Sequence, residues 1–361
     1  MPLDYEQIID YAAQELCSDV HFSPNARIYL RRNTVLQAVG EPITNEQILE
    51  MLGAMLQEQD QLQLEQQHQV DFVFRTAGGT RLRGNAFHED KGTGVSFRII
   101  RERPFPIQDL GFPEFVLERI AHMRNGLVLV VGPTGQGKST TLASFLQHRA
   151  EQQTGHIITI EDPVEYLLQS DTSVIQQREV GRDVRDFHSG IKSCLRADPD
   201  VIMVGEMRDL EAISATLTLA ETGHVVFSTL HTSSGPQTVS RIIDVFSADQ
   251  QEQVRSQLAT TLSMVISQRL VPRADGAGLV LAYEILTSNY AIQNYIRQNK
   301  VYQIPNAFQA DTSGEMVQLE QSLAGLVLSG IITKDTAYEY CRNSEQLTNI
   351  LKTNGIEANG V

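Results

Sequence analysis

Three glycines, a lysine and a serine are spaced across residues 132–139 in the way that phosphate binding requires. The octet Gly132-Pro133-Thr134-Gly135-Gln136-Gly137-Lys138-Ser139 fits the pattern GxxxxGK(S/T). Its glycines let backbone N–H groups turn inward around phosphate oxygens. Lys138 is expected to reach the β- and γ-phosphates, and the Ser139 hydroxyl is expected to bind Mg²⁺. The octet therefore predicts a site for a nucleoside triphosphate and Mg²⁺.

A second candidate is the carboxylate that ends an apolar run at residues 200–206. This run, DVIMVGE, predicts a buried strand with Glu206 at its tip. A carboxylate beside a phosphate-binding loop can orient a Mg²⁺-bound water or polarise the attacking water. The alternative is a solvated glutamate at a strand end. The phosphate-binding pattern upstream favours the functional interpretation.

Three further carboxylates, Glu161, Asp162 and Glu165, follow a predicted strand at residues 156–160. The carboxyl ends of parallel strands form the ligand crevice of α/β sheets, so one of the three could act as a general base. The alternative is a surface turn around Pro163. The residues alone leave both interpretations open.

Two histidines, His224 and His231, flank the apolar run at residues 225–230 and should lie at opposite ends of one strand. This spacing does not suggest a zinc pair. A histidine near the γ-phosphate could sense whether that phosphate is present. The alternative is a hydrogen-bonded residue at a strand end, which the spacing alone favours.

Arginines are concentrated near the end of the amino-terminal hundred residues. They are Arg81, Arg83, Arg98, Arg101 and Arg103. An arginine supplied by a neighbouring domain or subunit can stabilise charge on a transferring phosphoryl group. Ordinary surface ion pairs are the alternative for each of them.

The elements that must position these residues divide the chain into four parts. Residues 1–100 mix a helix with β-rich segments and predict a small α+β domain, and the prolines of residues 101–113 predict a linker. In residues 114–288, short apolar runs alternate with helical stretches, which predicts an α/β domain with a parallel sheet. Residues 289–361 are predicted to be helical.

Composition narrows the function classes further. The 361 residues carry a formal net charge of −15 with a pI of about 5.0, which disfavours binding to nucleic acid. Three separated cysteines offer neither a disulfide framework nor a cysteine-rich zinc site. The sequence shows no long apolar stretch and no signal-peptide pattern. We therefore expect a cytoplasmic protein.

Four sequence boxes in this order resemble the secretion ATPase superfamily of type II secretion and type IV pili, most closely its PilT-type twitching-motility branch. The Walker A, aspartate, Walker B and histidine boxes of that family match Gly132–Thr140, Ile160–Tyr166, Asp198–Asp209 and Thr222–Thr232. Residues 18–21 and 81–87 also look like the PAS-like N-terminal domain of the family. The resemblance implies a RecA-like P-loop ATPase core behind that domain, with a helical C-terminal part.

The resemblance also implies roles for individual residues. Glu161 becomes the expected general base, Glu206 the residue that orients Mg²⁺ and water, and His231 a γ-phosphate contact. His224 becomes a candidate as well. Arg81 and Arg98 become candidates for the family's arginines that reach the nucleotide.

At the level of the whole protein, the resemblance implies a cytoplasmic homohexamer that hydrolyses ATP with Mg²⁺ and drives pilus retraction. The expected partners are an inner-membrane pilus platform protein and a paralogous retraction ATPase, with peripheral membrane association only and no nucleic acid.

A C-terminal segment carries the resemblance to the retraction branch, which has a segment written AIRNLIRE. Residues 291–298 read AIQNYIRQ, with departures at Gln293, Tyr295 and Gln298. The alternatives are a pilus extension or secretion ATPase, a motor of another export system, a nucleotide-binding scaffold without turnover, and a DNA translocase. The extension and secretion ATPases generally carry an extra N-terminal domain and often a four-cysteine zinc module. The chain has neither the length nor the cysteines for these additions.

Overall fold

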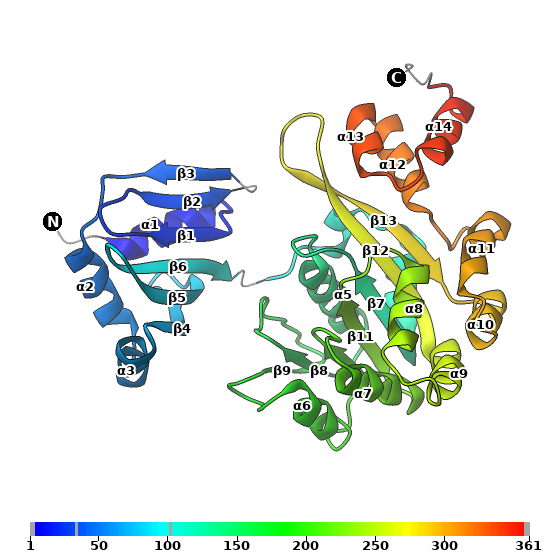
Figure 1. The fold of residues 1–361 in the computed structure, drawn as a ribbon, viewed down its shortest axis with the longest axis horizontal. Helices are drawn as coiled ribbons and strands as arrows, with labels where there is room; N and C mark the ends of the chain where they lie inside the picture. The colour runs from blue at the N-terminus through cyan, green and yellow to red at the C-terminus, as the bar shows by residue number, and fades with distance from the viewer. Residues whose placement is uncertain (1–3, 33–34, 101–102, 357–361) are drawn as a thin grey trace. The chain divides into compact units, whose positions relative to one another are not determined.

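The computed structural model describes residues 4–32, 35–100 and 103–356, which form two compact units, Met1–Arg103 and Pro104–Val361. Each unit has its own sheet and its own hydrophobic core (Figure 1). Of the predicted linker, residues 101–102 lie outside the described residues. Ile107 and Phe112 are buried in the core of the second unit.

The first unit is an α+β fold around a six-stranded sheet in the order β3-β2-β1-β6-β5-β4, with every neighbouring pair antiparallel. Its elements are α1 (Tyr5–Gln14), β1 (Asp19–Phe22), β2 (Ile28–Arg32), β3 (Val35–Val39), α2 (Asn45–Met55), α3 (Glu58–Gln67), β4 (Gln69–Arg75), β5 (Arg81–Glu89) and β6 (Gly92–Ile100).

Alternating side chains give this sheet one buried and one polar face. On β1, Val20 and Phe22 pack in the core with the buried residues of α1 and α2, while Asp19 and His21 are only partly buried. Thr44 begins α2 with a capping box that satisfies free N–H groups. The glutamine-rich α3 buries only Leu64 and is otherwise a solvated helix, because it has few apolar positions.

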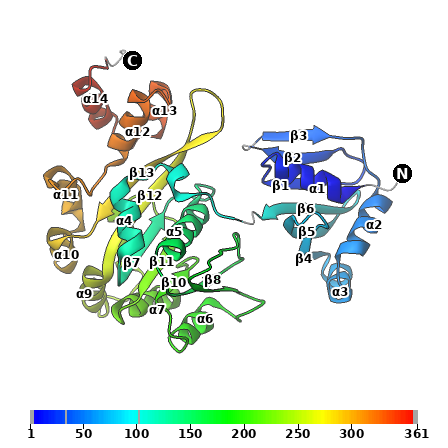
Figure 2. The ribbon, with the colours of Figure 1, turned by 180° about the vertical axis from the view of Figure 1, so that it is seen from behind.

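The second unit is an α/β fold around a seven-stranded sheet in the order β13-β12-β7-β11-β10-β8-β9 (Figures 1 and 2). Its sheet-forming part comprises η1 (Ile107–Leu110), α4 (Glu114–His122), β7 (Gly126–Val131), α5 (Lys138–Gln152), β8 (His156–Glu161), β9 (Val174–Glu179), α6 (Phe187–Cys194), β10 (Val201–Val204), α7 (Leu210–Glu221), β11 (Val225–Leu230), α8 (Gly235–Asp244), α9 (Gln251–Thr261), β12 (Leu262–Pro272) and β13 (Leu279–Thr287).

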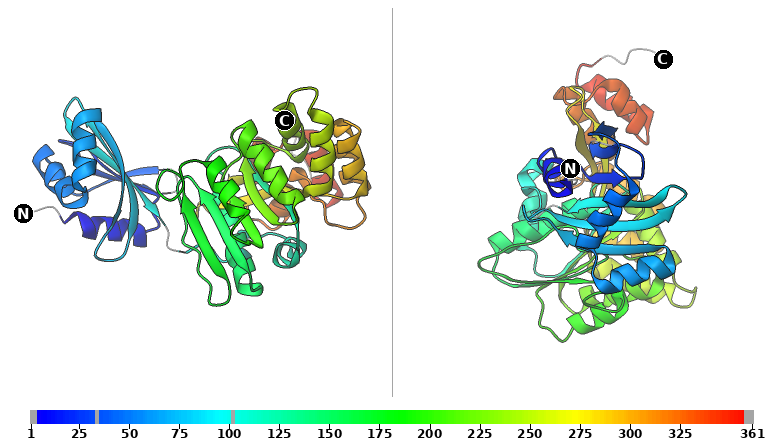
Figure 3. Two further views of the ribbon diagram at one scale, coloured as in Figure 1. Left: turned by 90° about the horizontal axis from the view of Figure 1, so that it is seen from below. Right: turned by 90° about the vertical axis from the view of Figure 1, so that its left-hand side faces the viewer.

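The α/β prediction is confirmed, and helices cover both faces of the sheet (Figure 3). On β7, Val128 and Val130 pack with α4 and α5, whereas Leu127 and Leu129 pack with α6 to α9. All strands from β12 to β9 in the sheet order are parallel, and β13 adds an antiparallel edge. The sequence analysis did not predict the strands β12 and β13.

The register of the parallel strands brings their carboxyl ends together. Val131 of β7 pairs with Leu230 of β11, and Val204 of β10 pairs with Ile160 of β8. The residues that follow these strands therefore meet at one edge of the sheet.

The C-terminal part is helical, as predicted. It contains α10 (Tyr290–Arg297), η2 (Val301–Gln303), α11 (Ile304–Ala310), α12 (Leu319–Leu328), α13 (Lys334–Tyr340) and α14 (Ser344–Thr353). The last three helices share a small core with Val271 of β12 and Ala282 of β13, which fixes them to the edge hairpin. Nowhere in the described ranges is a helix long and apolar enough to span a bilayer.

Candidate nucleotide-binding site

The glycine-rich loop between β7 and α5 has a backbone that requires glycine. Gly132, Gly135 and Gly137 have φ angles of 152°, 79° and 77°, which other residues rarely adopt. A Cβ at Gly132 would lie 2.6 Å from the carbonyl oxygen of Gln268 on β12. The loop ends at Gly137, and α5 begins at the next residue. At this amino end of the helix, free backbone N–H groups and the helix dipole favour an anion.

The Lys138 side chain is folded onto this loop. Its Nζ donates to the carbonyl oxygens of Gly132 at 2.9 Å and Pro133 at 3.0 Å. Burial lowers the pKa of Lys138, while the carboxylates of Glu206 and Glu165 oppose that shift. The lysine is thus held at the mouth of the loop, within reach of phosphates bound there.

The residues present fit a nucleotide with Mg²⁺. Ser139, at the start of α5, is exposed, and Glu206 follows the end of β10 with 19% of its side chain exposed. A hydroxyl and a carboxylate are hard oxygen donors, which Mg²⁺ prefers together with phosphate oxygens and water.

Glu206 lies at the centre of a charged cluster. Its Oε1 is 2.9 Å from Nε2 of His231, and its Oε2 accepts from Nε of Arg208 at 2.9 Å. Arg208 also lies 3.4 Å from Oδ2 of Asp162. The sequence analysis did not single out Arg208 as a site residue, although it stands two positions after Glu206. The structure shows that it joins the Walker B strand to the aspartate box.

Glu161 is a buried carboxyl group at the end of β8. It accepts from Thr159 Oγ1 at 2.5 Å and from Gln177 Nε2 at 3.1 Å. Burial raises the pKa of Glu161 to about 7, with the two hydrogen bonds opposing the shift and Glu165 adding to it. A carboxyl group with a pKa near neutrality can accept a proton in a water-excluding site.

Gln177, which the sequence analysis did not name, and Tyr166 of the aspartate box itself hold this box in place. Gln177 of β9 donates to Glu161 and to the carbonyl oxygen of Tyr166, and it accepts from the N–H of Leu168. The Tyr166 hydroxyl lies 2.8 Å from Oγ1 of Thr140 on α5. The segment after β8 is therefore tied both to the edge strand and to the phosphate-binding helix.

The strand β12 braces the phosphate-binding loop from its other side. Gln268, of which 1% is exposed, donates through Nε2 to the carbonyl oxygen of Gln136 at 2.6 Å. The Gln136 side chain in turn accepts from the N–H of Leu270 at 2.7 Å. No sequence pattern pointed to Gln268, because it lies more than a hundred residues from the loop.

The structure brings together the loop, Glu161, Glu206 and His231, but not every predicted site residue. His224 lies at the opposite end of β11, where its Nδ1 is 3.0 Å from Thr222 Oγ1 and from the Leu219 carbonyl oxygen. Within one chain, His224 is not at the loop. Arg81 and Arg98 belong to β5 and β6 of the first unit, where Arg98 pairs with Asp19 at 3.1 Å.

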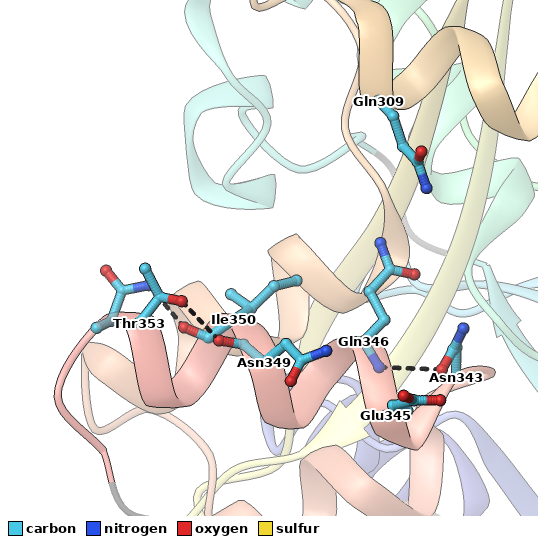
Figure 4. Close-up of a pocket in the computed structure, with 8 residues that line it drawn as sticks. Gln309, Asn343, Glu345, Gln346, Asn349, Ile350 and Thr353 are labelled. Carbon is cyan, nitrogen blue, oxygen red and sulfur yellow. Dashed lines mark hydrogen bonds between the residues drawn. The ribbon is translucent and has the colours of Figure 1, made fainter.

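A cavity of about 480 Å³ lies apart from this site, between α11 and α14 (Figure 4). Its lining is dominated by amide side chains and consists of Gln309, Asn343, Glu345, Gln346, Asn349, Ile350, Thr353 and Asn354. None of these residues belongs to the four sequence boxes, so the cavity is not the candidate nucleotide site.

Comparisons with known proteins agree with the four boxes. The family described as type II/IV secretion system protein matches residues 2–355. The chain is 40% identical over 344 residues to the type IV pilus retractation ATPase PilT of Pseudomonas aeruginosa, covering 95% of this chain and 99% of that one. It is 43% identical over 303 residues to a twitching motility protein of Neisseria gonorrhoeae, covering 84% and 81% of the two chains.

A solved structure supports the same relationship. The crystal structure of the pilus retraction motor PilT with bound ADP superimposes with a TM-score of 0.87, at 38% identity, and covers 96% of this chain and 99% of that one. The chain therefore belongs to the type II/IV secretion system ATPase family and is similar over nearly its whole length to PilT.

Proposed function

We propose that this protein is an ATP-hydrolysing motor that powers the retraction of type IV pili. The observation that carries the proposal is the meeting of the glycine-rich loop, Glu161, Glu206 and His231 at one edge of the sheet. This arrangement occurs in a chain that is similar along its length to a pilus retraction motor.

In this proposal, water attacks the γ-phosphate in line, the bond from that phosphorus to the β–γ bridging oxygen breaks, and ADP leaves. The protein acts mainly through positioning and charge. The loop at Gly132–Thr140 and the amino end of α5 bind the phosphates, with Lys138 moving from the loop carbonyls to phosphate oxygens. Glu161 accepts the proton of the attacking water. His231 contacts the γ-phosphate. Because His231 also contacts Glu206, the position of the phosphate affects the position of the Glu206 carboxylate.

Ser139 and Glu206 would hold Mg²⁺, directly or through water. The ion would supply positive charge that neutralises the phosphate oxygens. Glu206 is already oriented by His231 and Arg208, so its carboxylate is held in place at the site.

The remaining predicted residues are assigned to the assembled motor. We propose a homohexamer in which Arg81, Arg98 and His224 act on nucleotide at subunit boundaries. The ring would work at the cytoplasmic face of the inner membrane on a pilus platform protein, alongside a paralogous retraction ATPase. Similarity to PilT and the expectations from the four boxes support this assembly.

A deletion strain tests the function in the cell. It is complemented with the wild type, with Glu206→Gln, or with Glu211→Gln, a matched change at an exposed position on α7. A retraction motor predicts surplus surface pili and no twitching in the deletion strain and with Glu206→Gln, and normal behaviour with the other two.

Other outcomes identify other motors. Absence of pili in the deletion strain would make the protein an extension motor, and unchanged pili would point to another export system or to a redundant paralogue. Purified Lys138→Ala and Glu206→Gln should retain the fold by circular dichroism and lose phosphate release. Near-normal hydrolysis by either variant would contradict the site.

A further inference from the structure

One arginine outside the four boxes connects the C-terminal helices to the loop that follows His231. Arg342 stands between α13 and α14. Its guanidinium donates through Nη2 to the carbonyl oxygen of Ser233 and, at 3.1 Å, to Oγ of Ser267, and through Nη1 to Oε2 of Glu284. One side chain thus contacts the loop that follows His231, strand β12 and strand β13.

The acceptors of Arg342 hold the same loop themselves. Glu284, of which 6% is exposed, accepts through Oε1 from the N–H of Gly235 at 2.8 Å, where α8 begins. Ser267 donates to the Ser233 carbonyl oxygen at 2.7 Å. A buried carboxylate is stable only with close partners, and Arg342 supplies the cation. The backbone between His231 and α8 is therefore fixed by a partly buried ionic network.

The main chain around Arg342 is fixed as well. The N–H groups of Arg342 and Asn343 both donate to Oε1 of Glu320 at 2.9 Å, and Glu320 is a buried residue of α12. Arg269 of β12 donates to the Tyr340 carbonyl oxygen at 2.9 Å. The guanidinium is consequently held at a set position relative to the C-terminal helices.

This network ends two residues from the charged cluster of the site. His231 precedes Ser233 by two positions, and its Nε2 lies 2.9 Å from Glu206 Oε1. A shift of the Ser233 backbone would change that distance, because two residues of chain leave little freedom to absorb it.

We propose that Arg342 is a positioning residue for ATP hydrolysis, which holds the loop of residues 231–235 through Ser233 and Glu284 and so sets the His231–Glu206 contact. The inference rests on the proposed ATPase function. It also gives the C-terminal helices a mechanical connection to the nucleotide site, since a displacement of α12 to α14 would move the guanidinium.

Steady-state kinetics of the full-length protein test this assignment. Arg342→Met should lower kcat about tenfold and leave the KM for ATP within about twofold, because the phosphate-binding loop is untouched. Arg342→Lys should recover part of kcat, since it keeps the charge beside Glu284. Arg273→Met is the matched control, because Arg273 pairs with the neighbouring Asp275 in the β12–β13 turn, and it should behave as the wild type.

A double-mutant cycle shows whether Arg342 acts through His231. In a His231→Ala background, Arg342→Met should cause little further loss of kcat. Equal fold losses in the two backgrounds would overturn the proposal. If Arg342→Met does not fold, Ser267→Ala replaces it in the same cycle, because this smaller change removes one contact to the Ser233 carbonyl oxygen.

Hydrogen exchange provides a readout that does not depend on turnover. Backbone amides of residues 231–240 should exchange faster in Arg342→Met and Ser267→Ala than in the wild type and Arg273→Met. Unchanged exchange would overturn the positioning role even if the ATPase function stands. Absence of hydrolysis by the wild type, with faster exchange in the variants, would instead contradict the proposed function.

Discussion

Glu161 shows how the fold changes the chemistry of one residue. Its carboxyl group ends β8 and is covered so that 9% is exposed. Burial raises the pKa to about 7, and the hydrogen bonds from Thr159 and Gln177 limit the rise. The group can therefore exist in both protonation states near neutral pH. Arg208 shows a second effect of the fold, since it connects two boxes that lie far apart in the sequence.

The first prediction concerns the pH dependence of hydrolysis. Only the carboxylate form of Glu161 can accept a proton, so the rate should fall as the pH drops through about 7. Glu161→Gln should lower kcat by about 10²–10⁴-fold above pH 7, and the difference from the wild type should shrink as the pH falls below that value. Initial rates of phosphate release across this range measure both effects. A wild-type profile that stays flat through pH 7 would remove Glu161 from the role of base.

The raised pKa of Glu161 also predicts how the stability of the protein depends on pH, which can be measured without the ATPase reaction. The folded-state pKa of about 7 lies above the ordinary value of 4.5, so wild-type stability should decline as the pH rises between these values. Glu161→Gln cannot ionise and should gain on the wild type by at most ~1.4 kcal/mol per pH unit in that window. Urea unfolding at both ends of the window measures the difference.

At the scale of elements, the phosphate-binding loop depends on a neighbouring strand as well as on its own glycines. β12 pairs with β7 and supplies Gln268 and Leu270 to hold Gln136. The loop is therefore clamped between the strand that precedes it and the strand beside it. Such preorganisation reduces the conformational cost of binding a nucleotide.

The second prediction tests this brace. Gln268→Leu removes the donor to the Gln136 carbonyl oxygen while keeping a similar volume, and it should raise the Kd for ATP about tenfold through loss of a buried hydrogen bond. Titration with a fluorescent ATP analogue measures the Kd. Gln253→Leu, at an exposed position on α9, is the control. Equal affinities of the two variants would show that the brace does not contribute.

At the scale of the whole molecule, the second unit contains the loop, Glu161, Glu206 and His231, while Arg81 and Arg98 belong to the first unit. Arg98 has 69% of its side chain exposed and pairs with Asp19. Exposed pairs contribute little to stability, which leaves the guanidinium available for another partner. In the proposed ring, the nucleotide bound to a neighbouring subunit would be that partner of Arg98.

The third prediction uses mixtures of inactive variants to test for shared sites. If Arg98 acts on the nucleotide of a neighbouring subunit, Arg98→Ala and Glu206→Gln should each be inactive alone. A mixture of the two should recover part of the activity, because some interfaces then combine two intact halves. Phosphate release after subunit exchange measures this recovery.

A second mixture is the control for that experiment. Lys138→Ala and Glu206→Gln affect the same half of the site, so their mixture should stay inactive. Recovery in this control, or none in the first mixture, would contradict the role of Arg98.

The sequence by itself determined the phosphate-binding loop, the buried strands around it and the clustering of the carboxylates after them. These features are local: glycine spacing sets the loop backbone, and apolar runs set the strands. Since β7, β8, β10 and β11 are parallel, the residues that follow them had to meet at one edge. The strands β12 and β13 escaped prediction, as did β3 and α2 of the first unit.

Only the tertiary structure decided the contacts between distant segments. Gln268 meets Gln136 across 132 positions, and Arg342 meets Ser233 across 109. No local pattern encodes such pairs, because they follow from the order of strands in the sheet and from the placement of the C-terminal helices. The raised pKa of Glu161 depends on packing in the same way, since burial is a property of the whole fold.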